Sequence, residues 1–269
     1  MSRRSSRPGP RSLVALGWLA RVGAAPGEPL ALVMNWTPPG LYDHVARLVA
    51  AGLVRRIAMT RGEGSLLVLT ADGARMVGLS PAVAPRAVAP TTWAHVVACA
   101  WTAAWFEVRG RDWLSGRELA HDDGWAGQVV YQDGYGRTQR QRHRPDLATF
   151  IGTARLPVAV EVELQRKSPA RLRGIMAMYV QRTADADAQL LNAADGGAEQ
   201  LAGVVYIAGS ESISRAVRDA AHASGLGEHP DGRLRVLALE DVITQTREHA
   251  ARTRAALRSS PTTEAPVGT

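Results

Sequence analysis

The stretch from Leu156 to Ser168 reads LPVAVEVELQRKS, and it decides how the second half of the chain is interpreted. Its apolar residues fall on one side of an extended chain: Val158, Val160, Val162 and Leu164. Its polar residues fall on the other side: Glu161, Glu163 and Gln165. A period of two is typical of a β-strand with one buried face. We therefore predict a half-buried strand with a carboxylate face, followed by an amphipathic helix after Ser168 and Pro169.

Strands and helices alternate around this segment. The apolar runs at 201–209 and 233–239 predict further strands, and the periodic stretches at 212–225 and 241–257 predict helices. The segment 91–110 predicts a mostly buried helix. This alternation indicates an α+β or α/β layer fold for the second part of the chain.

Three carboxylates occur in two neighbouring predicted strands. Asp146 opens a strand-like segment that follows a basic run, and Glu161 and Glu163 lie ten or more residues later. Carboxylates placed side by side repel one another, and a divalent cation relieves the repulsion. Oxygen ligands suit Mg²⁺. The pattern predicts a magnesium site.

Pro145, Asp146 and Glu161 resemble the motif of the restriction-endonuclease-like, PD-(D/E)xK nuclease superfamily. The lysine of that motif falls on Glu163 here, and Lys167 is the only lysine in the chain. The resemblance implies a mixed-sheet nuclease domain that hydrolyses phosphodiesters with Mg²⁺. It implies that Asp146, Glu161 and the main-chain carbonyl of Val162 hold the ion, with Glu163 or Lys167 orienting the attacking water.

Arginines surround the predicted site in sequence and are expected to bind the DNA backbone. They are Arg140, Arg142, Arg144, Arg166, Arg171 and Arg173. The chain as a whole carries 32 basic and 25 acidic residues, for a net charge of +7. This excess favours an anionic partner, most commonly nucleic acid.

The first part of the chain reads as three helices followed by a β-hairpin, and it resembles the winged helix-turn-helix family. The stretch that carries this resemblance is RLVAAGLVRRIAMTRGEGSLLVLTADG, which begins at Arg47. The resemblance implies that one helix enters the DNA major groove and that the wing lies along the backbone. The expected base contacts are Tyr42, His44 and Arg47. The expected phosphate contacts are Arg55, Arg56 and Arg61. A winged helix used for protein contacts is the alternative.

Changes in amino-acid composition along the chain divide it into five segments. We predict a basic arm at 1–10, a winged-helix DNA-binding domain at 11–80, a Pro/Ala-rich linker at 81–90, a nuclease-like domain at 91–257 and a tail at 258–269. The combination of winged helix, linker and "HRPDLATF … LPVAVEVELQRKSPARLRGIMAMY" resembles the replication-relaxation family of plasmids and integrative elements. Within that resemblance, Glu118 is expected to supply an extra acidic residue.

Other function classes are disfavoured. There is no phosphate-binding loop, no G-x-S-x-G elbow and no apolar run long enough for a membrane span. The lone Cys99 fits a reducing cytoplasm and is expected to be a small core residue. Tyr131 or Tyr135 offers a relaxase-type nucleophile, without a histidine cluster beside it. The scattered histidines disfavour a zinc site: His121, His143, His222, His229 and His249.

We therefore expect a cytoplasmic, two-domain protein that binds double-stranded DNA in plasmid or mobile-element replication or relaxation, together with other replication or transfer proteins. The favoured activity is Mg²⁺-dependent nicking. The alternative is a non-catalytic regulator or assembly factor with a degenerate nuclease domain.

Overall fold

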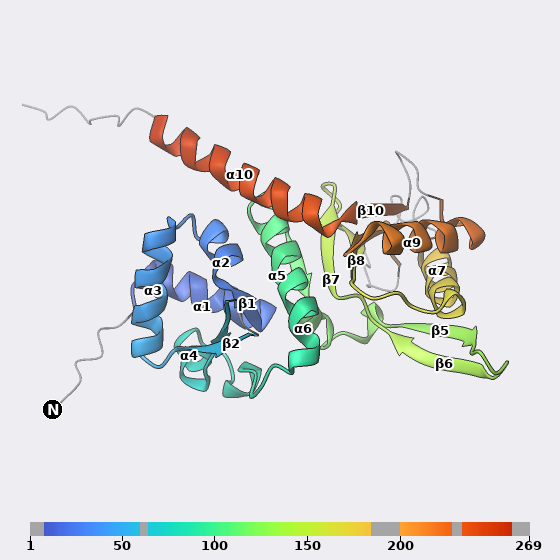
Figure 1. The fold of residues 1–269 in the computed structure, drawn as a ribbon, viewed down its shortest axis with the longest axis horizontal. Coiled ribbons are helices and arrows are strands. Elements are labelled where there is room, and N and C mark those ends of the chain that lie inside the picture. The colour runs from blue at the N-terminus through green and yellow to red at the C-terminus, as the bar shows by residue number, and fades with distance from the viewer. Residues whose placement is uncertain (1–7, 60–63, 184–199, 228–232, 260–269) are drawn as a thin grey trace, which may run out of the picture.

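The computed structural model describes residues 8–59, 64–183, 200–227 and 233–259, which form a mixed α/β fold (Figure 1). The predicted arm, Arg61 in the wing and the predicted tail lie wholly or mostly outside the described residues. Across the described ranges, none of the helices combines the length and apolarity that crossing a bilayer requires.

The first part contains the three predicted helices and the predicted hairpin in the expected order. Its elements are α1 Pro10–Val22, β1 Ala24–Pro26, α2 Gly27–Val33, α3 Pro38–Ala50, β2 Val54–Ala58, β3 Ser65–Leu69 and α4 Ala71–Met76. The strands form an antiparallel sheet in the order β1-β3-β2. Thr37 begins α3 by accepting a hydrogen bond from the Gly40 amide, with Pro38 as the first helical residue. Thr70 caps α4 in the same way through the Gly73 amide.

Gly73 is required by close packing rather than by its backbone angles. A Cβ atom there would lie 2.2 Å from the carbonyl oxygen of Leu53 and 2.8 Å from Leu69 Cδ1. Gly73→Ala is therefore expected to lower the free energy of unfolding by about 1–3 kcal/mol, measured by urea denaturation. Gly17→Ala on α1 is the matched control, because open space surrounds its Cβ position. It should raise stability by about 0.5–1 kcal/mol. Equal effects of both substitutions would contradict the packing argument.

The predicted linker is held against the first part. It contains short 3₁₀ turns at Pro81–Val83 and Pro90–Thr92. The guanidinium of Arg55 donates to the carbonyls of Pro85 at 2.8 Å and Arg86 at 3.0 Å. These bonds fasten the segment to strand β2.

The second part contains the predicted strands and helices together with a hairpin. Its elements are α5 Trp93–Glu107, β4 Trp113–Ser115, α6 Gly116–Leu119, β5 Gly127–Gln132, β6 Thr138–His143, β7 Leu147–Ile151, β8 Leu156–Glu163, α7 Pro169–Thr183, β9 Gly203–Ala208, α9 Glu211–Ala223, β10 Leu234–Ala238 and α10 Leu239–Ser259. Five strands form one sheet in the order β10-β9-β8-β7-β4, with β8, β9 and β10 parallel and β7 and β4 successively antiparallel.

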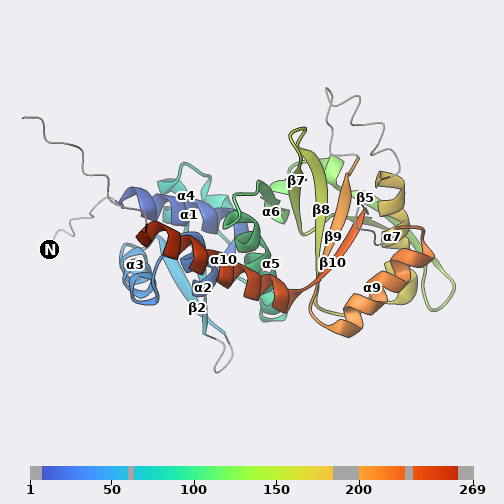
Figure 2. The same ribbon diagram turned by 90° about the horizontal axis from the view of Figure 1, so that it is seen from above.

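Helices cover this sheet on both faces (Figure 2). Val160 and Val162 pack with the apolar face of α5, whereas Ala159 and Tyr206 pack with α7 and α9. The prediction that β8 is half-buried is therefore wrong, since every residue from Val158 to Glu163 is buried. The alternating residues of β8 face two different buried surfaces, because β8 is the central strand of a sheet that helices cover on both faces.

The basic segment before Asp146 forms a strand of its own. Strand β6 pairs with β5 in a separate two-stranded hairpin that lies beside α7 and projects from the sheet (Figure 1). Its outward positions include Arg140 and Arg142, and its inward positions include Gln141 and His143. The hairpin carries His143 to the end of β8.

The two parts share one hydrophobic core. Helix α5 lies between them, and its Ala100 and Ala103 belong to the same cluster as Leu16 of α1 and Val160 of β8. Helix α10 runs back along the first part (Figure 1), where Arg247 pairs with Glu28 of α2 at 2.7 Å and 2.9 Å. The residues on either side of the predicted linker therefore pack as one body.

Candidate functional site

The candidate site lies where β7 begins beside the end of β8. The pair Leu147–Val160 in the ladder places Asp146 level with Glu161. The Asp146 amide donates to the carbonyl of Val160 at 3.1 Å, and the Val162 amide donates to Asp146 Oδ2 at 2.8 Å. The side chain of Asp146 thus takes the place of a main-chain acceptor in the ladder, and its position is fixed by the sheet.

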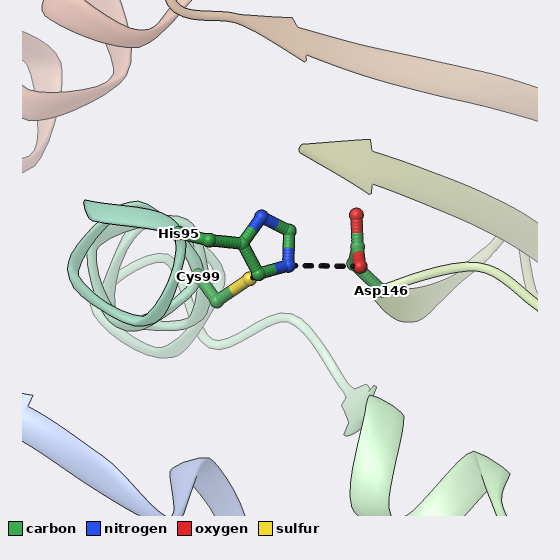
Figure 3. A group of neighbouring side chains, drawn as sticks. All are labelled: His95, Cys99 and Asp146. Carbon is green, nitrogen blue, oxygen red and sulfur yellow. Dashed lines mark hydrogen bonds and ion pairs between the residues drawn. The ribbon is translucent and has the colours of Figure 1, made fainter. Parts of the chain in front are cut away.

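The other oxygen of Asp146 faces helix α5 (Figure 3). Its Oδ1 lies 3.1 Å from His95 Nε2, and Cys99 Sγ lies 3.5 Å from the same nitrogen. His95 and Cys99 are four residues apart, so they lie on one face of α5. Within the residues that the structure describes, these side chains form the single group of three metal-binding residue types whose ligand atoms all lie within 4.8 Å of one another.

Neighbouring groups shift the pKa values of His95 and Cys99. The hydrogen bond to Asp146 raises the pKa of His95 above its ordinary value. Burial, together with the carboxylates of Asp146 and Glu161, raises the pKa of the Cys99 thiol well above its ordinary value. Cys99 is therefore a thiol unless a cation displaces its proton.

Glu161 points to the opposite side of the sheet, toward α7. It is 4% exposed, and its Oε1 accepts hydrogen bonds from His143 Nε2 at 2.7 Å and from the hydroxyl of Tyr179. Burial and the neighbouring Glu161 raise the pKa of Tyr179, which keeps this phenol a donor. Two donors therefore hold the Glu161 carboxylate in place.

Glu163 forms an ion pair with Lys167, four residues further on. The side chains of Glu163 and Lys167 are 9% and 20% exposed. Burial lowers the pKa of Lys167 below its ordinary value, while the carboxylates of Glu161 and Asp146 oppose this change. The predicted site residues therefore lie near one another, with Lys167 paired to Glu163 and influenced by the charges of Glu161 and Asp146. The three carboxylates do not, however, gather within the spacing met by His95, Cys99 and Asp146.

A pocket of about 340 Å³ opens beside Asp146, between α1, α5, α6 and the start of β7. His95, Cys99 and Asp146 line it together with three arginines: Arg21, Arg117 and Arg144. Glu118, expected to add a carboxylate to the site, instead caps α6 through the Ser115 amide and accepts from Arg21 Nε at 3.0 Å. The charged side chains that line the pocket are therefore the three arginines and the carboxylate of Asp146, beside His95.

The residues expected to contact DNA bases are on α3. Tyr42 is 67% exposed and Arg47 is also exposed. The ring of His44 stacks on Trp36 with the centroids 4.3 Å apart, and its Nδ1 lies 2.9 Å from the Arg47 guanidinium. Burial is the main cause of the lowered pKa of His44. Tyr42 and Arg47 are thus the more accessible of the three.

The residues expected to contact phosphates differ in accessibility. Arg56 is exposed on β2, whereas Arg55 is engaged by the two linker carbonyls. Arg142 and Arg144 both reach Asp123, at 2.6 Å and 3.4 Å.

The two tyrosines considered as relaxase-type nucleophiles both lie in or beside the β5–β6 hairpin. Tyr135 lies in its turn, 87% exposed, and Tyr131 is paired with Gln139. Among the described residues, the side chain of Asp146 hydrogen-bonds to His95 and to the Val162 amide rather than to either tyrosine.

Several residues of the site were missed or set aside by the sequence argument. His95 was not singled out, Cys99 was assigned to the core, and His143 was counted among scattered histidines. The spacing His95-x₃-Cys99 within a predicted helix was the available signal, because side chains four residues apart converge. Nothing in the sequence marked Tyr179 as a site residue, because it occurs among the regularly spaced apolar residues of α7.

The fold and the site define a mixed α/β protein with a polar site at the junction of its two parts. No family model matches the chain, and no curated protein sequence matches it. Among solved structures it is similar to the protein VC1899 from Vibrio cholerae, at 13% identity and a TM-score of 0.31. The alignment covers 93% of this chain and 58% of that one, so this chain spans less than two thirds of that protein. A similarity of this size assigns neither fold nor function.

Proposed function

We propose that this protein binds double-stranded DNA and cleaves its phosphodiester bonds with Mg²⁺, in the replication or relaxation of a plasmid or mobile element. The observation that supports this most strongly is the grouping of Asp146, just before β7, with Glu161 and Glu163 at the end of β8, where both glutamates are buried and Lys167 pairs with Glu163. Burial of such an excess of negative charge is costly without a cation.

The donor set fits Mg²⁺, because carboxylate and carbonyl oxygens are its preferred protein ligands. Asp146, Glu161 and the main-chain carbonyl of Val162 would hold the ion. Because Asp146 Oδ1 faces His95 on α5 and Glu161 faces Tyr179 on α7, the two carboxylates would have to converge at the end of β8 to share it. When bound, the ion polarises the phosphoryl oxygen and lowers the pKa of a coordinated water.

The chain's own residues orient the reacting groups. The Val162 amide fixes Asp146, while His143 and Tyr179 fix Glu161. Lys167 would take the role that the motif gives to its lysine, and its ion pair with Glu163, four residues earlier, supports this assignment. Its ammonium would bind the phosphate or orient the attacking water, with Glu163 accepting a proton from that water.

Several surfaces support DNA as the substrate. The order α1, β1, α2, α3, β2, β3 with a three-stranded sheet agrees with the winged-helix interpretation, in which α3 presents Tyr42 and Arg47 to bases and Arg56 lies on the wing. The exposed Arg140 and Arg142 of the β5–β6 hairpin extend the basic surface toward the site.

Incubation of the full-length protein with supercoiled plasmid tests the proposal. Wild type should convert supercoiled to open-circular DNA in Mg²⁺ and not in excess chelator. Asp146→Ala should abolish conversion because it removes a cation ligand. Asp219→Ala, on the exposed face of α9, is the matched control and should leave it unchanged. Conversion by Asp146→Ala at the wild-type rate would refute hydrolysis at this site.

A non-catalytic DNA-binding regulator is the second candidate. Two observations favour it: His95 engages one oxygen of Asp146, and Glu163 replaces the lysine of the motif. This candidate is supported if the protein binds plasmid and origin-containing DNA in a salt-dependent manner but nicks neither in Mg²⁺.

A further inference from the structure

We propose that His95, Cys99 and Asp146 form a binding site for Zn²⁺ on the α5 side of the sheet. The inference does not rest on the proposed hydrolysis, with which it shares Asp146 alone. The predicted magnesium ligand Glu161 faces α7, whereas His95 and Cys99 belong to α5.

The three ligands are held by different parts of the fold. Helix α5 is buried in the core shared by both parts, so the imidazole and the thiol project from a rigid backbone. Asp146 is held by the Val162 amide through Oδ2, which leaves Oδ1 facing His95. The site is therefore assembled before any ion binds.

The distances suit a tetrahedral ion. Zn–N and Zn–O bonds of about 2.0–2.1 Å and Zn–S bonds of about 2.3 Å place neighbouring ligand atoms roughly 3.3–3.7 Å apart. The separation from His95 Nε2 is 3.1 Å to Asp146 Oδ1 and 3.5 Å to Cys99 Sγ. All three ligand atoms lie within 4.8 Å of one another, and an ion bound between them would replace the hydrogen bond between His95 and Asp146.

The donor types select the metal. A thiolate, an imidazole and a carboxylate favour Zn²⁺ and similar borderline ions over Mg²⁺, which prefers oxygen. Three protein ligands leave a fourth position, as in catalytic zinc centres. All three residues line the 340 Å³ pocket, so that position opens to water within it.

Cobalt absorption spectroscopy tests the site, because Co²⁺ takes tetrahedral zinc sites and is coloured in them. Metal-stripped full-length protein titrated with Co²⁺ should develop thiolate-to-cobalt charge transfer in the near ultraviolet and intense visible bands at one equivalent. Zn²⁺ should bleach both. Cys99 is the single cysteine of the chain, so the charge-transfer band identifies its sulfur without ambiguity.

Substitutions distinguish the residues that bind the metal from residues that do not. Cys99→Ala should remove the charge-transfer band, and His95→Ala and Asp146→Asn should each weaken Co²⁺ binding at least about 10-fold. His121→Ala, at an exposed position, should match wild type. Glu161→Gln should retain the cobalt spectrum, whether or not the protein nicks DNA, which distinguishes this proposal from the nuclease proposal. Absence of the charge-transfer band in wild type, or its persistence at full strength in His95→Ala, overturns the site.

Discussion

Glu161→Gln is expected to reduce Mg²⁺-dependent plasmid nicking at least about 100-fold, equivalent to roughly 2.7 kcal/mol in the activation barrier. The substitution removes the negative charge that would bind the cation. It preserves the size of the side chain and its ability to accept from His143 and Tyr179. The fold should therefore survive, and the initial rate of open-circle formation is the measurement.

The control for this experiment is Tyr179→Phe. It removes one donor to Glu161 and leaves the carboxylate in place. We expect a smaller loss of rate than in Glu161→Gln. Thermal unfolding by circular dichroism should show both variants folded at the assay temperature. A Glu161→Gln rate within twofold of wild type would mean that Glu161 is a structural residue.

Lys167→Met is expected to lower the free energy of unfolding by about 2–4 kcal/mol. The ammonium pairs with a carboxylate whose side chain is 9% exposed, and removing it leaves that negative charge buried near Glu161 and Asp146. Lys167→Arg keeps a cation and should cost less. Urea denaturation at neutral pH measures the three proteins.

A double-mutant cycle isolates the pair itself. Glu163→Gln combined with Lys167→Met should recover stability to within about 1 kcal/mol of wild type, because both charges are then absent. Nicking should not recover with it. Additive losses from the two substitutions would show that the ion pair of Glu163 and Lys167 contributes nothing to stability.

Much of the secondary structure could be predicted, since each element had a local signal. The alternating residues of β8 and the apolar periodicity of α7 predicted their types correctly. Ser168 and Pro169 correctly predicted where α7 begins. The burial of β8 could not be predicted from its alternating residues. The same alternation is expected for a strand with an exposed charged face and for a strand whose charged face is covered by a helix such as α7.

The candidate site was predicted in part for a similar reason. Asp146, Glu161, Glu163 and Lys167 are close in sequence once two adjacent strands are recognised. His95 comes from a helix 51 residues before Asp146, and its approach depends on how α5 packs against the sheet. Hydrophobic packing of this kind is non-directional, so residue patterns alone do not specify it.

Helix α5 has a consequence for how the protein can be divided. Its Trp101 packs with Leu32 of α2 and Ala250 of α10, so truncation anywhere in residues 79–90 leaves apolar surface exposed on both fragments. The intact chain should therefore melt in one cooperative transition, and separately expressed halves should aggregate or associate with each other. Recombination that exchanges only one half would have to replace the surface of α5 as well, so the two halves are expected to be inherited together.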